Sequence, residues 1–194
     1  MKKTLMLIAV FVLTTVFTND TIAQTFDKLD KSPLDIARFP YSFRTSDKVL
    51  RVTYSRPELN GRKVSKLAPA GKVWRTGANE IPEITFYRDV IFGGTPVKAG
   101  TYSLVTIPGE KEWTVILSKQ LNTWGAYFYK KDEDVARVKG KVRMFGKGID
   151  DYKVKFDPRK PELRDFIERF SITFDDDMTM QMGWGNVLVS VPIK

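Results

Sequence analysis

Short runs in which apolar and polar residues alternate fill most of the chain after residue 47, and they limit its fold more than any other feature. Successive side chains of a β-strand point to opposite faces, so each run presents one apolar face. Turn-forming residues separate the runs, as at Gly93-Gly94 and at residues 108–111. About ten such strands without recurring helices predict an all-β fold, an antiparallel β-sandwich of jelly-roll or immunoglobulin-like type. The apolar positions that carry the pattern include Leu50, Val52, Tyr54, Ile84, Phe86, Trp113, Val115, Leu117, Val138, Val142, Tyr152, Val154, Phe156, Ile172, Phe174, Met178, Met180, Met182, Trp184, Val187, Val189, Val191 and Ile193.

Two short segments depart from this pattern. Residues 163–170 place apolar side chains at the spacing of one helical face, and Pro161 suits a first helical turn. Residues 34–38 favour one helical turn inside an N-terminal arm at residues 24–46. We therefore expect at most one or two short helices beside a single β-sandwich domain at residues 47–194.

The N-terminus has the features of an export signal at residues 1–23. Two lysines precede an apolar run at residues 5–17, which is too short to span a bilayer. Small residues at Thr21 and Ala23 predict cleavage before Gln24. The alternative is an uncleaved membrane anchor. Because the chain has no Cys, a lipoprotein anchor is excluded, and we expect a protein of the periplasm or the exterior.

The chain is basic, with a formal net charge of +9, and much of the excess lies in two predicted strands. Residues 137–160 contain nine Lys or Arg and three Asp. For an exported protein this charge favours anionic glycans or lipid headgroups over nucleic acid as partners. Peripheral contact with an anionic envelope surface is one interpretation. The other is that lysines on an exposed strand prevent aggregation between sheets.

Several classes of chemistry are excluded by residues that the chain lacks. It has no His, which excludes imidazole acid–base catalysis and Ser-His-Asp triads. It has no Cys, which excludes thiolate catalysis and the usual zinc sites. Gly71-Lys72 is followed by Val73, so no phosphate-binding loop is present. We assign no catalytic residue, cofactor or metal; only a carboxylate mechanism remains open.

Several segments of the chain form a distinctive set: YSRP at 54–57, GR at 61–62, GKVWRTGANE at 71–80, AGTYSL at 99–104, IPG at 107–109, EWTVI at 112–116, WG at 124–125 and VSVPI at 189–193. Together these segments resemble an uncharacterised bacterial family, domain of unknown function 2911. The resemblance implies an exported, predominantly β domain without an established activity. It covers nearly all of the chain after the signal and adds nothing about chemistry.

The irregular stretch at residues 54–80 is the best candidate for a ligand site, because polar loops on a rigid scaffold often carry function. Arginine guanidinium groups match carboxylate or phosphate, an amide and a carboxylate add directional contacts, and an indole offers a stacking face. The predicted ligand is a small anionic molecule or a glycan. The residues assigned to this site are Arg56, Arg62, Trp74, Arg75, Asn79 and Glu80.

A structural interpretation of the same residues is equally concrete. In it, Arg75 pairs with Glu80, Arg56 and Arg62 bind backbone carbonyls, and Trp74 fills the end of the sandwich. A third alternative is a glycosidase-like hydrolase that uses Glu80 and Glu83. The distance between the two carboxyl groups decides that alternative, because retaining and inverting glycosidases hold them about 5–5.5 and 6.5–9.5 Å apart.

Two further groups of residues are weaker candidates. Trp124, Tyr127 and Tyr129 form either a platform for sugar stacking or part of the core. The acidic runs at residues 132–134 and 175–177 lack the ligand spacing of a calcium loop, so we interpret them as solvated turns or as counter-charge for the basic strands. The sequence leaves the oligomeric state open.

Overall fold

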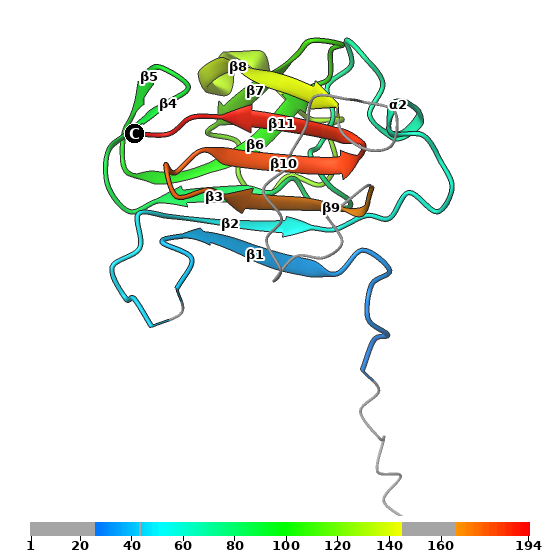
Figure 1. Cartoon of the computed structure of the whole chain (residues 1–194), viewed down its shortest axis with the longest axis horizontal. Coiled ribbons are helices and arrows are strands. Elements are labelled where there is room, and N and C mark those ends of the chain that lie inside the picture. The colour runs from blue at the N-terminus through cyan, green and yellow to red at the C-terminus, as the bar shows by residue number, and fades with distance from the viewer. Residues whose placement is uncertain (1–25, 43, 145–165) are drawn as a thin grey trace, which may run out of the picture.

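The computed structural model describes residues 26–42, 44–144 and 166–194 (Figure 1). Within these residues the chain forms β-strands joined by turns and loops, together with the short α-helix α2 (Val64–Leu67) and the 3-10 turn η1 (Lys131–Glu133). The strands are β1 (Leu34–Phe39), β2 (Leu50–Ser55), β3 (Glu83–Phe86), β4 (Val90–Phe92), β5 (Thr95–Val97), β6 (Gly100–Ile107), β7 (Glu112–Ser118), β8 (Asp134–Met144), β9 (Ile167–Phe174), β10 (Met180–Gly185) and β11 (Val187–Val191).

Nine of the described strands form one antiparallel sheet in the order β1-β2-β3-β6-β7-β8-β11-β10-β9, and β4 and β5 form a separate hairpin. In Figure 1, β9, β10 and β11 run in front of β3 and β6. The sheet curves until its two edge strands, β1 and β9, come into contact. The prediction of an all-β antiparallel fold is confirmed, and its two layers belong to one nearly closed sheet.

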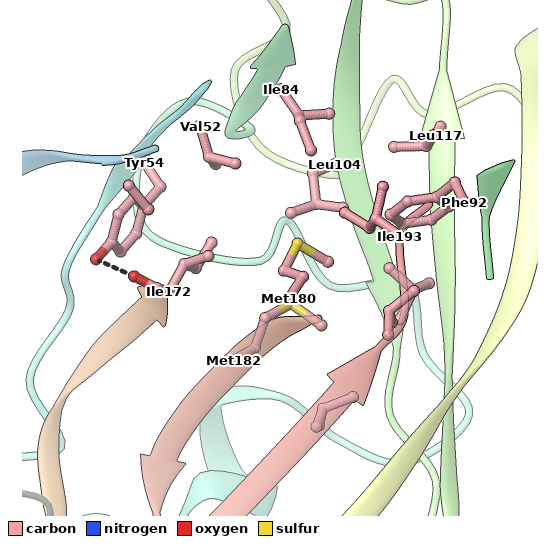
Figure 2. Close-up of a cluster of buried hydrophobic side chains, with 14 of the residues drawn as sticks. Val52, Tyr54, Ile84, Phe92, Leu104, Leu117, Ile172, Met180, Met182 and Ile193 are labelled. Atoms are coloured by element: carbon pink, nitrogen blue, oxygen red, sulfur yellow. Dashed lines mark hydrogen bonds between the residues drawn. The ribbon is translucent and has the colours of Figure 1, made fainter. Parts of the chain in front are cut away.

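The core lies inside this curved sheet and is built from the alternating residues. Leu50, Val52 and Tyr54 of β2 are buried, whereas Arg51 between them is exposed. Figure 2 shows Val52, Ile84 and Leu104 from one layer facing Met180 and Met182 from the other. The register of each strand is therefore fixed by which face it buries.

Hydrogen bonds from β2 and from residues 57–59 after it connect this side of the sheet to β9. We call this junction between the edge strands β1 and β9 the seam. The Tyr54 hydroxyl donates to the carbonyl of Ile172 at 3.3 Å, as Figure 2 shows. Beyond β2, Phe170 donates its backbone N–H to Pro57 at 3.0 Å, and Leu59 donates to Glu168 at 3.1 Å. These bonds satisfy backbone groups that an open sheet edge would leave unpaired.

The predicted turns at Gly93-Gly94, residues 108–111 and residues 175–177 are confirmed. Gly93 and Gly94 join β4 to β5 with φ of 54° and 91°, a two-residue hairpin turn that needs positive φ at both positions. Residues 108–111 join β6 to β7. The acidic run at 175–177 is also a turn, in which the Asp175 carboxylate accepts the backbone N–H of Thr179 at 2.8 Å. In the other acidic run, Asp134 begins β8 and pairs with Arg137, which fits the counter-charge interpretation.

Both helix predictions are wrong where they can be compared. Residues 34–38 belong to strand β1, because pairing with β2 overrides their local preference. Residues 167–170 belong to β9. There the helix-like spacing comes from an irregular register, in which Gly183 and Gly185 of β10 pair with Ser171 and Ile167. The extra residues bring Ile167 and Phe170 to the same face of the strand.

Other predictions fall on residues that the structure does not describe. These are the export signal, the second basic strand at residues 152–156 and the predicted hairpin turn at 146–148. The first basic strand is β8. In the described part of the chain, no helix has the length and apolar character needed to cross a bilayer.

Candidate functional site

The loop at residues 71–80 is held against β6 by backbone hydrogen bonds. Trp74 donates its N–H to Thr106 at 2.7 Å and accepts the N–H of Thr106 at 3.1 Å, and Gly71 donates to Pro108 at 2.9 Å. This ladder gives Trp74 the orientation of a strand residue and turns its side chain inward. Trp74 is only 6% exposed.

The Trp74 ring is the centre of a buried aromatic group. Trp184 stacks on it with ring centroids 5.3 Å apart, and Trp113 and Phe170 meet it edge-on at 5.8 and 5.2 Å. A ring enclosed in this way has no free face for a ligand. The structure therefore places Trp74 in the core rather than at a binding surface.

Arg56 bridges the seam between the edge strands. Its Nη1 lies 3.1 Å from the Asp35 carboxylate, its Nε donates to the carbonyl of Phe170 at 3.2 Å, and its Nη2 donates to the Ser171 hydroxyl at 2.8 Å. The guanidinium thus joins β1 to β9 and is occupied by protein partners.

Arg62 forms hydrogen bonds within the loop that contains it. Its Nε donates to the carbonyl of Leu59 at 2.7 Å, and its Nη2 donates to the carbonyl of Glu58 at 2.8 Å. These contacts are those of the structural interpretation given above for Arg56 and Arg62.

Arg75 differs from the other two arginines because most of its donors are unused. Its Nε donates to the carbonyl of Gly77 at 3.3 Å. Among the described residues, neither Nη atom has a hydrogen-bond or ion-pair partner, and the ion pair with Glu80 that the structural interpretation required is not formed. The guanidinium is half-buried, so it is oriented without being occupied.

The loop between Arg75 and Glu80 has an unusual backbone. Thr76 and Asn79 have φ of 57° and 60°, a region that β-branched residues such as Thr rarely adopt. Thr76 is fully buried, and its hydroxyl donates to Thr106 Oγ1 at 3.1 Å. Strained loops that their surroundings hold in place are concentrated at functional sites.

Residues 79–81 pair with the loop at 119–133, which connects β7 to β8. Gly125 donates its N–H to Asn79 at 2.9 Å, Ile81 donates to Thr123 at 3.0 Å, and Glu80 and Trp124 are directly opposite each other. Side chains of directly opposed residues lie on the same face. Glu80 and Trp124 are therefore neighbours on the outer surface, and both are exposed.

Trp124 and Tyr127 form an aromatic pair that is open to solvent. Trp124 is 57% exposed and Tyr127 is 78% exposed, and their rings are 6.1 Å apart and within 15° of parallel. A Cβ added at Gly125 would lie 3.0 Å from the Tyr127 ring and 3.9 Å from Nη1 of Arg75. Arg75 and the aromatic pair therefore converge at Gly125.

Tyr129, the third aromatic predicted for a platform, anchors this loop instead. Its ring packs on Ile81, Val105 and Ile116, a small apolar cluster on the outer face of the sheet. Its hydroxyl donates to the Asp134 carboxylate at 2.7 Å. Partial burial and that carboxylate raise the pKa of Tyr129 to about 12, so the donor stays protonated.

A depression lies next to Glu80. Its volume is about 110 Å³, and its lining includes Glu80, Glu83 and Asn122. The Glu83 carboxylate accepts the backbone N–H of Asn122 at 3.0 Å. In the described residues no group of three or more acidic side chains is arranged to hold a metal ion.

The structure thus divides the six predicted site residues into two groups. Arg75, Asn79 and Glu80 lie together with Trp124 and Tyr127, and we call these five residues the outer patch. Arg56, Arg62 and Trp74 lie elsewhere; whether any of the six binds a ligand stays a prediction. Trp124 and Tyr127 were recognisable as aromatics near a glycine, but their exposure depends on the long-range pairing at Glu80.

The comparisons with known proteins agree with the resemblance seen in the sequence. The search of curated proteins and the search of solved structures each found no match. A family model described as "Protein of unknown function (DUF2911)" matches residues 37–164, a range that contains every residue of the outer patch. Because the match spans more than half of the chain, the protein belongs to this family of unknown function, DUF2911.

Proposed function

We propose that this protein is an exported, non-catalytic module that binds a glycan on the outer patch. The observation that carries the proposal is the exposed, nearly parallel pair of Trp124 and Tyr127. An exposed aromatic pair is an apolar surface that a ligand can cover, and aromatic faces suit the apolar faces of sugar rings. The proposal replaces Trp74 with Trp124 as the stacking residue.

The polar members of the outer patch offer hydrogen-bond acceptors and donors to a sugar that stacks on the aromatic pair. The Glu80 carboxylate has no hydrogen-bond or ion-pair partner among the described residues, and it lies beside Trp124. A carboxylate accepts hydrogen bonds from sugar hydroxyls, and the free Nη atoms of Arg75 donate to ring or carboxylate oxygens. Binding pockets use a few such convergent polar groups for orientation.

The outer patch is held in place before any ligand arrives. The Tyr129 ring and its bond to Asp134 fix one end of the aromatic loop, and two backbone bonds to Asn79 and Ile81 fix its middle. A surface ordered in advance loses less entropy on binding. This supports a binding role more than a merely exposed loop would.

Export completes the proposal, because glycans of the envelope and exterior become accessible only after secretion. It is supported by the basic, apolar and small-residue regions of residues 1–23. The test is the N-terminal sequence of protein recovered from the periplasm or the medium. We expect it to begin at Gln24; recovery of the intact N-terminus in a membrane fraction contradicts this part.

The binding test is affinity electrophoresis against a panel of neutral and acidic polysaccharides. We expect retardation by at least one polymer and a loss of about tenfold in affinity for Trp124→Ala and Tyr127→Ala. Tyr87→Ala is the matched control, because Tyr87 is 52% exposed and lies outside the outer patch. No retardation by any polymer, or an equal effect of Tyr87→Ala, overturns the proposal.

A second candidate, a carboxylate-dependent hydrolase, is favoured by one observation: Glu80 and Glu83 line the same depression. Two features weigh against it. The depression is about 110 Å³, whereas ligand pockets are usually about 300–1,000 Å³. Glu83 also already accepts a backbone hydrogen bond. Release of reducing ends from a bound polysaccharide, abolished by both Glu80→Gln and Glu83→Gln, identifies a hydrolase; we expect no release.

A further inference from the structure

We infer that the glycan recognised by the outer patch is an acidic saccharide, whose carboxylate binds Arg75 while its ring stacks on Trp124 and Tyr127. This inference rests on the proposed function and specifies its ligand. It comes from a contrast within the chain. Arg56 and Arg62 each donate hydrogen bonds to the protein from two or more guanidinium nitrogens, whereas Arg75 donates from Nε alone among the described residues.

The first step is the state of the Arg75 side chain. A guanidinium carries five N–H donors in a planar fork and stays charged at every physiological pH. At Arg75 one bond from Nε to Gly77 fixes the side chain, and both Nη atoms lack protein partners in the described residues. A carboxylate, the anionic group of acidic sugars, fits two parallel N–H donors.

The second step is the position of this fork. Nη1 of Arg75 and the Tyr127 ring approach the same point at Gly125, where the absence of a side chain lets the two groups come this close. A sugar ring on the aromatic pair therefore has its substituents within reach of the guanidinium. In that arrangement one ligand makes the stacking contact and the charged contact together.

Glu80 is the main objection, because a carboxylate on the same surface repels an anionic ligand. Its side chain is exposed, so water and salt screen it, and it lies opposite Trp124 rather than at Gly125. The geometry fits Glu80 to sugar hydroxyls and Arg75 to the carboxylate. This arrangement predicts the direction of one effect. Glu80→Gln keeps a hydrogen-bond acceptor and removes the negative charge, so it should strengthen binding of the acidic saccharide.

The third step is the charge next to the outer patch. Arg137, Lys139 and Lys141 alternate along the outer face of β8, and Arg137 donates to the Tyr129 hydroxyl at 2.7 Å. Lys139 and Lys141 are exposed, with Thr114 and Glu112 as register partners on β7, and form no ion pair within the described residues. A long acidic chain that leaves the outer patch along β8 meets these lysines.

The experiment compares uronic-acid polymers with the same polymers after methyl esterification, which removes the charge and keeps the sugar ring. Wild-type protein is titrated with polygalacturonate, alginate and hyaluronate in both forms. We expect the acidic form of at least one polymer to bind about tenfold more tightly than its ester, because a charge-assisted bidentate contact is lost. Added salt should reduce this preference.

Variants then assign the preference to a residue. Arg75→Gln should lose the preference for the acid and keep binding to the ester, and Arg75→Lys should recover part of it. Arg62→Gln is the control, at an arginine that is not part of the outer patch and whose donors bind the carbonyls of Leu59 and Glu58. The inference is overturned if acid and ester bind wild-type protein equally, or if Arg75→Gln weakens both in the same proportion. Thermal unfolding of each variant verifies that it is folded.

A different set of results would reject the proposed glycan binding itself, and not only the acidic character of the ligand. If neither acid nor ester of any polymer binds, or if Trp124→Ala changes neither, the outer patch is not a glycan site at all. If anionic phospholipid vesicles bind and Trp124→Ala leaves that binding unchanged, the basic face serves a lipid surface, and the acidic saccharide is rejected.

Length dependence tests the third step. The Lys139→Gln/Lys141→Gln double variant should weaken binding of long uronate polymers several-fold and leave binding of a disaccharide unchanged. An equal loss for both lengths contradicts a chain that runs along β8, because a disaccharide on the outer patch has no sugar there.

Discussion

Two aromatic groups in this protein come from similar sequence and have opposite surroundings. Trp74 and Trp124 both lie in irregular, glycine-containing loops, and the two loops are paired to each other at Glu80. Trp74 is enclosed by Trp113, Phe170 and Trp184, whereas Trp124 stacks with Tyr127 and is exposed to solvent. The difference is one of register: backbone bonds to β6 turn Trp74 inward, and pairing at the outer surface turns Trp124 out.

This contrast separates residues that hold the fold from residues that are free to bind. The aromatic rings of the buried group contact one another, whereas the rings of Trp124 and Tyr127 in the outer patch are exposed to solvent. The same division applies to charge, because Arg56 is saturated and Arg75 is not. The following experiments test the division, beginning with the largest expected effect.

Truncating the two tryptophans gives the largest difference. Trp74→Ala should lower the free energy of unfolding by about 3–5 kcal/mol, because it leaves a cavity among three aromatic rings. Trp124→Ala should lower it by less than about 1 kcal/mol, since an exposed ring adds little to folding. Urea denaturation of both variants measures this. A loss of several kcal/mol for Trp124→Ala means that the exposed pair has a structural role.

Alkaline pH tests the buried group through Tyr54, whose ring meets Phe170 edge-on at 6.0 Å. Burial raises the pKa of Tyr54 from 10.0 to about 12. The folded state therefore keeps its proton where the unfolded state loses it. The resulting stability is fully present below pH 10 and is lost as pH rises through 12, at most about 2–3 kcal/mol.

The measurement is urea denaturation at neutral pH and at several values between pH 10 and pH 12. Tyr54→Phe should be less stable at neutral pH, because it lacks the bond to Ile172, and should lose less stability on going to alkaline pH. Tyr129→Phe is the comparison from the outer face, since the pKa of Tyr129 is also raised to about 12. Equal alkaline slopes for wild type and Tyr54→Phe contradict the assignment.

The arginines give the next largest difference. Arg56→Ala should destabilise the protein by about 2 kcal/mol, because the carbonyl of Phe170 and the Asp35 carboxylate lose a charged donor at the seam. Arg75→Ala should change the free energy of unfolding by less than about 0.5 kcal/mol. Differential scanning calorimetry compares the two. If Arg75→Ala costs as much as Arg56→Ala, the guanidinium of Arg75 is structural and not available to a ligand.

These arginines also show how far the sequence could lead. Alternation identified the inward residues of β2 and β7, because these positions face the core whatever the partner strand is. Proximity along the chain suggested that Arg56, Arg62 and Arg75 converge, but the contacts that direct Arg56 come from β9, more than a hundred residues away. Ile167 and Phe170 looked helical because an irregular strand register gives the same spacing as a helix.

The outer patch was only partly predictable for the same reason. Arg75, Asn79 and Glu80 were identified from their composition, and they remain together because they are neighbours in one loop. Trp124 was considered as a platform residue, yet its nearness to Glu80 arises from pairing between two irregular segments. No local periodicity encodes such a pair, so the stacking face was assigned to Trp74 instead.

The smallest expected effect comes from Gly125, the point at which Arg75 and Tyr127 meet. Gly125 has φ of 69°, so Gly125→Ala should cost about 1 kcal/mol of stability through backbone strain. Its new methyl group would also lie 3.0 Å from the Tyr127 ring and displace it. Gly61→Ala is the matched control, because Gly61 has φ of 75° and open space where the methyl would stand. Both variants should lose similar stability in urea, and only Gly125→Ala should weaken polysaccharide binding; a similar loss of binding in both would show that the spacing at Gly125 does not shape the outer patch.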